Sequence, residues 1–379
     1  MATSISITDT ISQVVTDVVE MPAATLLQER YFGSGEMDIF DSRSLLIDYD
    51  NGDRKAGAFL KQGYANGDTT TFFSQTVVPP RIGVSDNIDT VSNDKDRMMF
   101  EQLSKMQKSG IRPTRADVFN ALLRLKAARC GDRVMRSIER LCVMALKENA
   151  VQFQYDTSPT DSTAVTCDVQ FYDPSLAANP QCITPTVAWG QSGATPYDDV
   201  CAAILAVKQH GGRAEDLLLS DDAWELLRAD MVAKGLWDNQ IHYTVIANGK
   251  DRDGLFPEIM DYVEVIGDIS FNGHRLKVIV YSHGYEAADG TFNSFLGNGF
   301  ACVLAPNCGH TLFGAVSKVN PKAIVDYNVD AVACLTGKLI GTRHVSTETD
   351  DVSVRVESVP LPIPRRVWSW VSIDCLKAW

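Results

Sequence analysis

The strongest pattern of apolar positions in the chain predicts one long helix over residues 115–148. Its apolar residues recur at three- and four-residue spacing, as on the buried face of an amphipathic helix. They are Val118, Leu122, Leu125, Ala128, Met135, Ile138, Cys142 and Ala145. Thr114 and Asp117 form a T-x-x-D capping pattern at its start. The stripe follows a 3.6-residue period rather than a heptad, so we expect a spine that packs on a sheet, about 51 Å long at about 1.5 Å per residue.

Residues 1–80 have the pattern of an arm followed by a protruding β-ribbon. In residues 1–40 the apolar positions follow a helical spacing that ends at Pro22, and nothing there predicts a compact domain. Residues 41–80 contain two strand-like runs, SRSLLIDYD and TTTFFSQTVVPP, separated by DNGDRKAGAFLKQGYANGD with its four glycines. An isolated two-stranded ribbon is marginally stable in water. We therefore expect this ribbon to lie on the surface of a partner.

The remaining chain alternates between helical and strand patterns. A short helix is expected at 94–109, and residues 151–195 predict a hairpin with connecting loops. From residue 196 to 317, helices and short apolar strands predict a compact α/β unit. Residues 318–379 are mostly strand-like and contain the alternating prolines of ESVPLPIPRRVWSW, followed by a last strand.

Composition and charge exclude several classes of protein. The 379 residues are 45% hydrophobic and 22% charged, as in ordinary globular proteins. The formal net charge of −13 argues against a dedicated nucleic-acid binder. Nine scattered cysteines, without close pairing, are typical of a reducing cytoplasm. There is no signal-peptide pattern, and no apolar run approaches the roughly 18 residues of a membrane span.

The predicted long helix is the basic part of this acidic chain. Residues 112–150 contain nine Lys or Arg and four acidic residues. One interpretation is a solvated face whose charges pair with acids elsewhere, and the other is a face turned toward a polyanion. The candidate residues for the polyanion face are Arg124, Arg129, Arg133, Arg136 and Arg140.

The sequence contains none of the common motifs of nucleotide-binding, metal-binding or catalytic sites that we considered. There is no Walker-type loop, no C-x-x-C, no H-E-x-x-H and no nucleophile elbow. Cys302, Cys308 and His310 lie close together but lack the fourth ligand of a structural zinc site. Ser282 and His283 are adjacent on a strand and so point to opposite faces. We expect no catalytic, cofactor or metal site and therefore a structural role.

Three stretches carry a resemblance to a known family. They are YVEVIGDISFNGHRLKVIVYSHGYEAADGTFNSFLGNGFACVLAPNCGHTLFGAV, DDAWELLRADMVAKG and ESVPLPIPRRVWSWVSIDCL. Together with the order of the predicted elements, they are similar to the lambda-type E capsid family of tailed-phage major capsid proteins. The resemblance implies the α+β Hong Kong 97-type capsid fold, and it covers most of the chain.

The resemblance also implies how the chain is divided. Residues 1–40 would be an N-terminal arm and residues 41–80 the extended β-loop. The peripheral domain would comprise residues 81–195, with the spine helix 115–148, and would be completed by residues 318–379. Residues 196–317 would form the axial domain. The closing strands are expected in the sheet beneath the spine helix, with the prolines at the turn between strands.

The resemblance further implies partners. The chain would assemble with itself into hexamers and pentamers of an icosahedral shell, in the host cytoplasm, and would end in the virion. A separate scaffolding protein is expected because no helical prodomain precedes the arm. A portal, a decoration protein and packaged DNA, bound through non-specific contacts, are further expected partners, but no membrane. The expected inter-subunit contact residues are Arg54, Lys55, Lys61, Phe72, Trp368 and Trp370.

Three other classes of protein stay open at this point. An encapsulin-like bacterial compartment would share the fold but enclose protein cargo. A metabolic α/β enzyme would need a concave site with convergent polar groups. A phage tail or decoration protein would not need the long helix or the inserted α/β unit.

Overall fold

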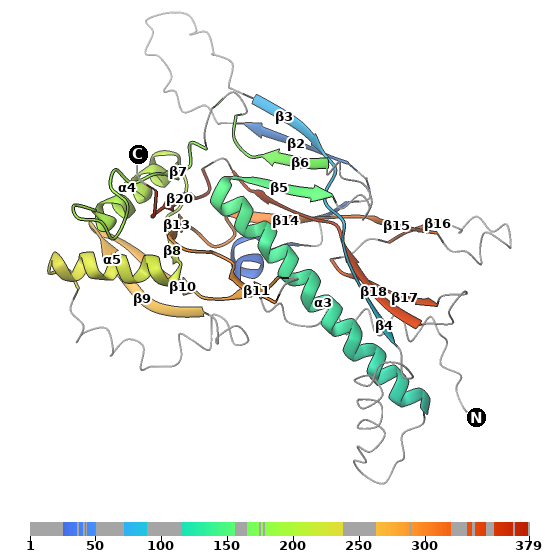
Figure 1. Cartoon of the computed structure of the whole chain (residues 1–379). Coiled ribbons are helices and arrows are strands. Elements are labelled where there is room, and N and C mark those ends of the chain that lie inside the picture. The colour runs from blue at the N-terminus through green and yellow to red at the C-terminus, as the bar shows by residue number, and fades with distance from the viewer. Residues whose placement is uncertain are drawn as a thin grey trace, which may run out of the picture.

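The computed structural model describes residues 26–35, 38–40, 42, 44–50, 72–88, 115–155, 165–173, 176, 179–237, 263–287, 290–319, 332–335, 338–345, 352–366 and 368–377. The helical pattern before Pro22, the short helix predicted at 94–109 and the ribbon tip at 51–71 lie outside these residues. Figure 1 shows a long helix flanked by several small sheets, with an α/β unit at one end.

The α/β unit is built on a six-stranded sheet in the order β7-β20-β13-β8-β10-β9. These strands are β7 (Cys182–Ile183), β8 (Asp216–Leu219), β9 (Val263–Phe271), β10 (His274–Tyr281), β13 (Phe300–Leu304) and β20 (Val371–Asp374). β8 pairs in parallel with β10 and antiparallel with β13, and all four of its residues are buried. A strand buried on both faces needs apolar residues at consecutive positions, which the run of three leucines supplies.

This sheet separates two hydrophobic cores. Leu217 and Leu219 pack with helices α4 (Pro196–Gln209) and α5 (Asp221–Ala233) in what we call the α/β core. Leu218 points to the opposite face and joins what we call the helix core, which surrounds the long helix α3 (Arg115–Glu148). Alternate residues of one strand thus serve two cores.

Helix α3 has the predicted bounds and is the spine of the helix core (Figure 1). It packs on η1 (Leu27–Tyr31), a turn of π-helix, and on four of the strands around it. Those strands are β4 (Ile82–Ile88), β5 (Ala150–Tyr155), β18 (Val352–Ser358) and β19 (Pro360–Pro364). β18 lies between β4 and β17 (Ile340–Val345), and β5 pairs with β6 (Val165–Gln170).

The core-facing stripe of α3 was predicted in part. Ile138, Cys142 and Ala145 are fully buried, as expected, but 37% of Leu125 is exposed. Lys126 is buried at 3% instead, because its ammonium donates to the Asn87 carbonyl at 2.6 Å and pairs with Asp86.

Several two-stranded ribbons extend from the cores. β2 (Leu45–Asp50) and β3 (Phe72–Val77) form the predicted antiparallel ribbon, with Asp50 paired to Phe72 at its outer end. The others are β11 (Gly284–Glu286) with β12 (Phe292–Ser294), and β15 (Val316–Val319) with β16 (Val332–Leu335).

The prediction that the closing strands all lie beneath the spine helix is wrong for β20. β20 pairs with β13 and β7 inside the six-stranded sheet. Val371 and Ile373 face the α/β core, where they are almost fully buried. The last strand therefore belongs to the α/β unit, because its alternate apolar residues match that face.

The prediction that the prolines mark a turn between strands is also wrong. Pro360, Pro362 and Pro364 are all within β19, which pairs with β14 (Gly309–Gly314) at the edge of the sheet β1-β14-β19, where β1 is Ile39–Phe40. Prolines two residues apart lose their N–H groups on the same side of the strand. β19 is thus an edge strand that pairs on one side only.

Within the described ranges, no helix combines the length and apolar character that a membrane span requires. Seven of the nine cysteines have described side chains, and all seven are free thiols: Cys130, Cys142, Cys182, Cys201, Cys302, Cys308 and Cys375.

Candidate functional site

Residues 26–33 lie between α3 and the six-stranded sheet, and we call them the buried N-terminal segment. Leu26, Leu27, Tyr31 and Phe32 are fully buried in the helix core. Four large apolar side chains within seven residues bury enough area to hold this stretch against the body of the protein. The segment is the first described part of the chain, and it lies inside the helix core.

Glu139 of α3 holds this segment from one side. Its Oε1 accepts hydrogen bonds from the Leu27 backbone N–H and from the Tyr281 hydroxyl, each at 2.8 Å. Its Oε2 accepts one from the Gln28 backbone N–H at 3.0 Å. Glu139 is fully buried. One carboxylate thus links η1, α3 and β10.

Asp216, the first residue of β8, holds the segment from the other side. The Arg30 guanidinium donates to it from Nε at 2.6 Å and from Nη2 at 3.0 Å, and the Tyr31 hydroxyl donates at 3.1 Å. Asp216 is 2% exposed. A bidentate guanidinium–carboxylate pair compensates a buried charge that would otherwise be very costly.

Phe32 completes the attachment. Its ring meets Trp370 edge-on, with the centroids 5.7 Å apart. Thr311 Oγ1 donates to the Phe32 carbonyl at 3.1 Å. Gly309 is required beside this ring, because a Cβ there would overlap Phe32.

Burial raises the pKa of Glu139 from 4.5 to about 7, although the three hydrogen bonds favour its charged form. The donors to Glu139 are two backbone amides and a phenol, so none brings a positive charge. Burial also raises the pKa of Tyr281 and of Cys142, so both keep their protons at neutral pH. Glu139 is therefore the group of this cluster that titrates near neutrality.

Four of the five predicted polyanion-facing arginines share one exposed stripe. Arg129, Arg133, Arg136 and Arg140 are all exposed. They follow one another at spacings of four, three and four residues, which places them on one face of α3. This face points away from the helix core. The Arg140 guanidinium lies 5.2 Å from the centre of the Tyr285 ring. We call these four residues the arginine stripe.

The other basic residues of α3 do not belong to this stripe. Arg124 is exposed, but its position in the helix puts it roughly a third of a turn or more away. Lys126 pairs with Asp86, and Lys147 donates to the Leu296 carbonyl at 2.8 Å. The interpretation of charges paired with acids elsewhere in the chain therefore holds for Lys126, whereas Lys147 bonds a backbone carbonyl instead.

Of the six residues predicted to contact a neighbouring subunit, the structure describes only Phe72, Trp368 and Trp370. Arg54, Lys55 and Lys61 lie outside the described residues. Phe72 begins β3 at the outer end of the ribbon, next to the predicted loop.

The two tryptophans of this set differ. Trp370 is 1% exposed and lies in the helix core, so the prediction that it contacts a neighbouring subunit is wrong. Trp368 is only partly buried and stacks on His210, with centroids 3.7 Å apart, so an inter-subunit role for it stays a prediction.

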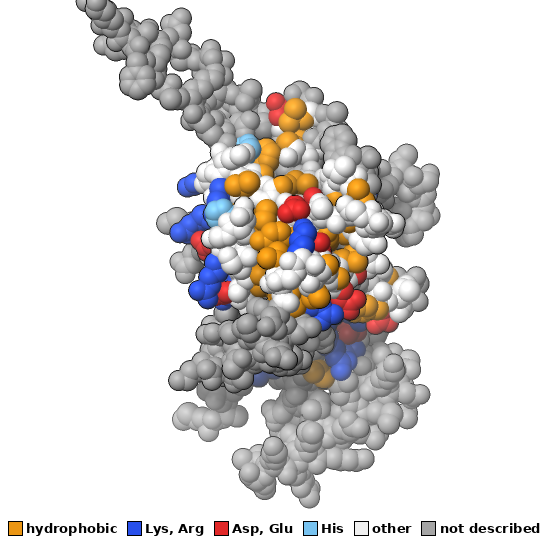
Figure 2. All heavy atoms as spheres, turned by 90° about the vertical axis from the view of Figure 1, so that its left-hand side faces the viewer, with side chains coloured by type: hydrophobic (Ala, Val, Ile, Leu, Met, Phe, Trp, Pro, Cys, Tyr) orange, Lys and Arg blue, Asp and Glu red, His pale blue; other side chains and the backbone are white. Residues whose placement is uncertain are grey.

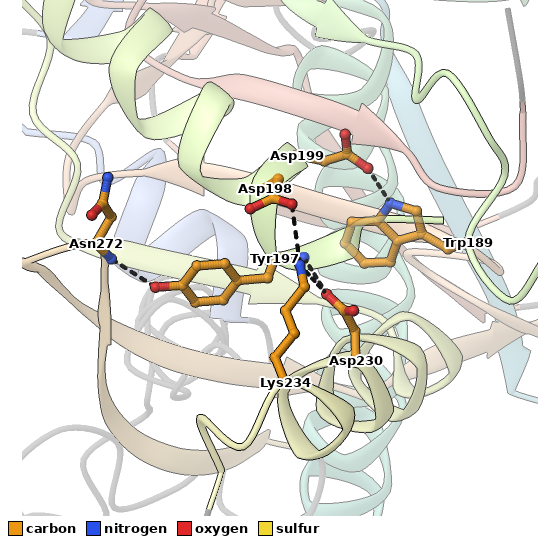
Figure 3. A network of polar contacts seen from close by, with 7 residues as sticks. All are labelled: Trp189, Tyr197, Asp198, Asp199, Asp230, Lys234 and Asn272. Atoms are coloured by element: carbon orange, nitrogen blue, oxygen red, sulfur yellow. Dashed lines mark hydrogen bonds and ion pairs between the residues drawn. The ribbon is translucent and has the colours of Figure 1, made fainter. Parts of the chain in front are cut away.

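A polar network fixes the far end of the α/β unit (Figure 3). Lys234, just after α5, lies 3.1 Å from both Asp198 of α4 and Asp230 of α5. Asp230 also accepts the Tyr197 backbone N–H at 3.0 Å, and the Tyr197 hydroxyl accepts the Asn272 backbone N–H at 2.8 Å. Two helices and the β9–β10 turn are thus held in one arrangement.

A neighbouring bond extends this network to the loop before α4. Trp189 is almost fully buried, and its Nε1–H donates to Asp199 at 2.8 Å. Burial raises the pKa of Asp199. The loop that enters α4 is therefore anchored on the helix itself.

The residues considered for metal binding have other contacts. Cys308 Sγ donates to the Tyr31 carbonyl at 3.8 Å, and His310 Nε2 lies 4.0 Å from Asp38. The described residues contain no group of three or more His, Cys, Asp or Glu side chains arranged around a common point. Ser282 donates to Asp221 at 2.7 Å, whereas His283 is next to Tyr281.

The buried N-terminal segment and both carboxylates that hold it were not predicted from the sequence. Glu139 was counted only among the four acidic residues of the basic stretch 112–150, and Asp216 was not singled out. One local signal was available: both acids are directly next to core residues, Ile138 and Leu217. A charged residue at such a position is usually paired.

Several solved structures are similar to this chain. A solved structure from Escherichia coli CFT073, assigned as a prophage capsid protein, matches with a TM-score of 0.56 and 14% identity over 96% of this chain and 98% of that one. A phage-related protein from Bordetella bronchiseptica RB50 matches at 0.47, with 11% identity over 97% of both chains. The capsid of Ralstonia phage GP4 matches at 0.46, with 13% identity over 95% and 93%. At such identities the first of these similarities shows the fold, which is the Hong Kong 97-type capsid fold.

No curated protein matches the sequence significantly. A family model, by contrast, matches residues 7–374, nearly the whole chain, and is described as phage major capsid protein E. A major capsid protein is a structural component that assembles with copies of itself into the shell of a virion, and it is not an enzyme. The chain belongs to the phage major capsid protein E family.

Proposed function

We propose that the chain forms the hexamers and pentamers of an icosahedral shell around the double-stranded DNA of a tailed phage. The observation that carries this proposal is the family match over residues 7–374. Closed point-group symmetry lets many modest contacts between identical chains add up to a stable container. Assembly would take place in the host cytoplasm.

We assign roles to the parts of the chain as follows. The α/β unit, residues 196–317 with β7 and β20 added and β14 removed, is the axial domain near the centre of each capsomer. Helix α3 and its sheets form the peripheral domain. The β2–β3 ribbon carries the extended loop. The arm expected at residues 1–40 would be limited to residues 1–25, because residues 26–33 are buried in the helix core and residues 39–40 pair with β14. The inclusion of β7 and β20 in the axial domain is a revision of the division expected from the sequence, and it rests on their pairing within the six-stranded sheet. By the same criterion β14 is assigned to the peripheral domain, because it pairs with β19.

The outer end of the α/β unit has the character of a contact surface between copies. Leu205 of α4, Val232 of α5 and Leu236 are 48%, 48% and 55% exposed. Figure 2, which views this end of the molecule, shows apolar side chains grouped in the middle of the face around a few charged ones, with further Lys and Arg side chains along one side. Interfaces between protein copies combine an apolar centre with a polar rim. The network around Lys234 would keep this face rigid.

The extended loop would lie across an adjacent subunit. Arg54, Lys55 and Lys61 are candidates for pairing with acidic residues there, and the net charge of −13 provides many such acids. Phe72, at the outer end of the ribbon, would contact the neighbour where the loop begins. Separate scaffolding, portal and decoration proteins would complete the particle.

Electron microscopy of negatively stained protein tests this proposal. The chain is expressed alone and then with its neighbouring genes. Closed shells, or hexameric and pentameric rings, are the expected result. A stable monomer or dimer under both conditions would contradict it. Nucleic acid inside shells produced with the packaging genes separates a viral capsid from an encapsulin-like compartment, which would contain protein cargo.

The arginine stripe would face the packaged DNA and contact its phosphates. Four cations along about three turns of a helix can each displace a counterion condensed on the duplex. Replacing Arg129, Arg133, Arg136 and Arg140 by glutamine should weaken binding of the unassembled protein to short duplex DNA. The slope of log affinity against log salt should fall by about 3–4, because each phosphate contact contributes about 0.9.

A matched control removes the same charge from the α/β unit. Lys208, Arg213, Arg228 and Arg275 are exposed there and would be replaced by glutamine in one variant. This variant should keep the wild-type salt slope. Equal slopes for both variants would show that the DNA contact depends on net charge alone and would refute a role for the stripe.

A further inference from the structure

The buried N-terminal segment is held mainly by hydrogen bonds to side chains of other elements. The two carboxylates Glu139 and Asp216 accept six hydrogen bonds, and five of these come from residues 27–31. The sixth comes from Tyr281 of β10. Glu139 belongs to α3 and Asp216 to the six-stranded sheet, so the segment bridges the two elements.

The segment is short, and it forms few backbone bonds to the strands around it. Its backbone is instead held by side chains and loop atoms: Thr311 donates to the Phe32 carbonyl, and the Asn307 backbone N–H donates to the Arg30 carbonyl at 2.8 Å. A stretch that has no ladder of strand pairing can leave its site without breaking a sheet.

The two carboxylates differ in how their charge is compensated. Asp216 faces the Arg30 cation at 2.6 Å. Glu139 receives its bonds from uncharged donors, and the charge of Glu29, on the same segment, raises its pKa further. Docking of the segment therefore leaves an ionised Glu139 buried and only partly compensated.

We propose that residues 26–33 form a pH-sensitive latch, which docks between α3 and the six-stranded sheet more tightly when Glu139 is protonated and more weakly when it is ionised.

The direction follows from linkage. When the segment is docked, burial holds the pKa of Glu139 at about 7. When the segment leaves, Leu26 and Leu27 no longer cover the carboxyl group, and its pKa returns toward the ordinary 4.5. The docked state then binds the proton more tightly, so docking strengthens as pH falls from 7 toward 4.5 and is pH-independent above and below that window.

The other ionisable groups around Glu139 do not supply this dependence. Burial, together with Arg136, lowers the pKa of His283, which lies 3.4 Å from the Tyr281 hydroxyl, so this ring stays neutral near pH 7. Tyr281 and Cys142 keep their protons because burial raises both pKa values. Burial likewise lowers the pKa of His310, on β14, against the opposing effect of Asp38. Asp216 is paired with Arg30 in the same site.

Hydrogen exchange of the full-length, unassembled chain tests the latch. The protection of amides 27–32 is compared at about pH 6 and about pH 8, after correction for the intrinsic rate. We expect about tenfold stronger protection at the lower pH, the ratio that a shift of the pKa from 4.5 to about 7 produces. Amides of β8 and α3 should stay protected at both values.

Two variants separate the roles of the carboxylates. Glu139→Gln, which cannot titrate, should abolish the pH dependence of this protection. Arg30→Gln removes the other anchor, so it should weaken protection at every pH but keep the tenfold ratio. If Glu139→Gln does not fold, the wild type and Arg30→Gln still give the ratio.

Two results would overturn the latch. One is a wild-type ratio below about twofold, which would mean that docking is not linked to Glu139. The other is exchange of amides 27–32 at the same rate as those of β8 and α3, because the segment would then open only when the whole chain unfolds.

Discussion

Deletion of residues 51–67 is expected to abolish shell formation while the chain stays folded. The deleted stretch is the centre of the proposed extended loop and contains Arg54, Lys55 and Lys61. The deletion leaves residues 68–71 between Asp50 and Phe72, which pair at the outer end of the β2–β3 ribbon. Four-residue loops commonly close β-hairpins, so the ribbon itself should form. What is lost is the contact with the neighbouring subunit.

Size-exclusion chromatography and negative-stain microscopy measure the assembly, and circular dichroism measures the fold. We expect a monomer with a wild-type spectrum and no shells. A control variant carries a glycine–serine stretch of the original length in place of residues 51–67, and it should also fail to assemble if the side chains of the loop matter. Closed shells from the deletion variant would show that the loop assignment is wrong.

Replacement of Trp370 by alanine is expected to lower the free energy of unfolding by about 3–5 kcal/mol, as for other large aromatic residues truncated in a core. The side chain is 1% exposed and meets the ring of Phe32 edge-on at 5.7 Å. Its removal opens a cavity between the buried N-terminal segment and the start of β20, which Trp370 directly precedes. Chemical denaturation of the unassembled chain measures this loss.

Two matched variants identify the cause. Trp370→Phe keeps a ring in the core and removes an indole N–H that is buried without a hydrogen-bond partner in the described structure, so it should lose much less stability than alanine. Trp368→Ala removes a partly buried ring from its stack on His210 and should also be milder. If Trp370→Ala unfolded at the wild-type denaturant concentration, the position of this residue in the core would be refuted.

The sequence predicted those elements that are specified locally. Helix α3 has a long 3.6-residue apolar period and was predicted with its observed bounds. The β2–β3 ribbon is encoded by two strand-like runs on either side of a glycine-rich stretch, and their pairing was confirmed. The family resemblance was carried by stretches such as DDAWELLRADMVAKG, and the family match confirmed it.

Features that depend on distant residues were not predictable in this way. Glu139 and Leu27 are 112 positions apart, and no local sequence pattern indicates that they form a hydrogen bond. Trp368 and Trp370 are nearly identical in local sequence context, yet the chain turns between them, and only Trp370 enters the helix core. The prolines of β19 suggested a turn because a proline removes a backbone donor. Spaced every second residue, they fit an edge strand equally well.

The interior position of β20 has a consequence for synthesis on the ribosome. β20 lies between β7 and β13, so the six-stranded sheet stays open until residues 371–374 have emerged. Translation delivers the chain from its N-terminus, and earlier units fold first. A nascent or prematurely terminated chain that lacks these residues would expose the apolar edge of its sheet and would not present a finished α/β unit to other copies. The order of translation would thus delay the closure of this sheet until β20 has been made.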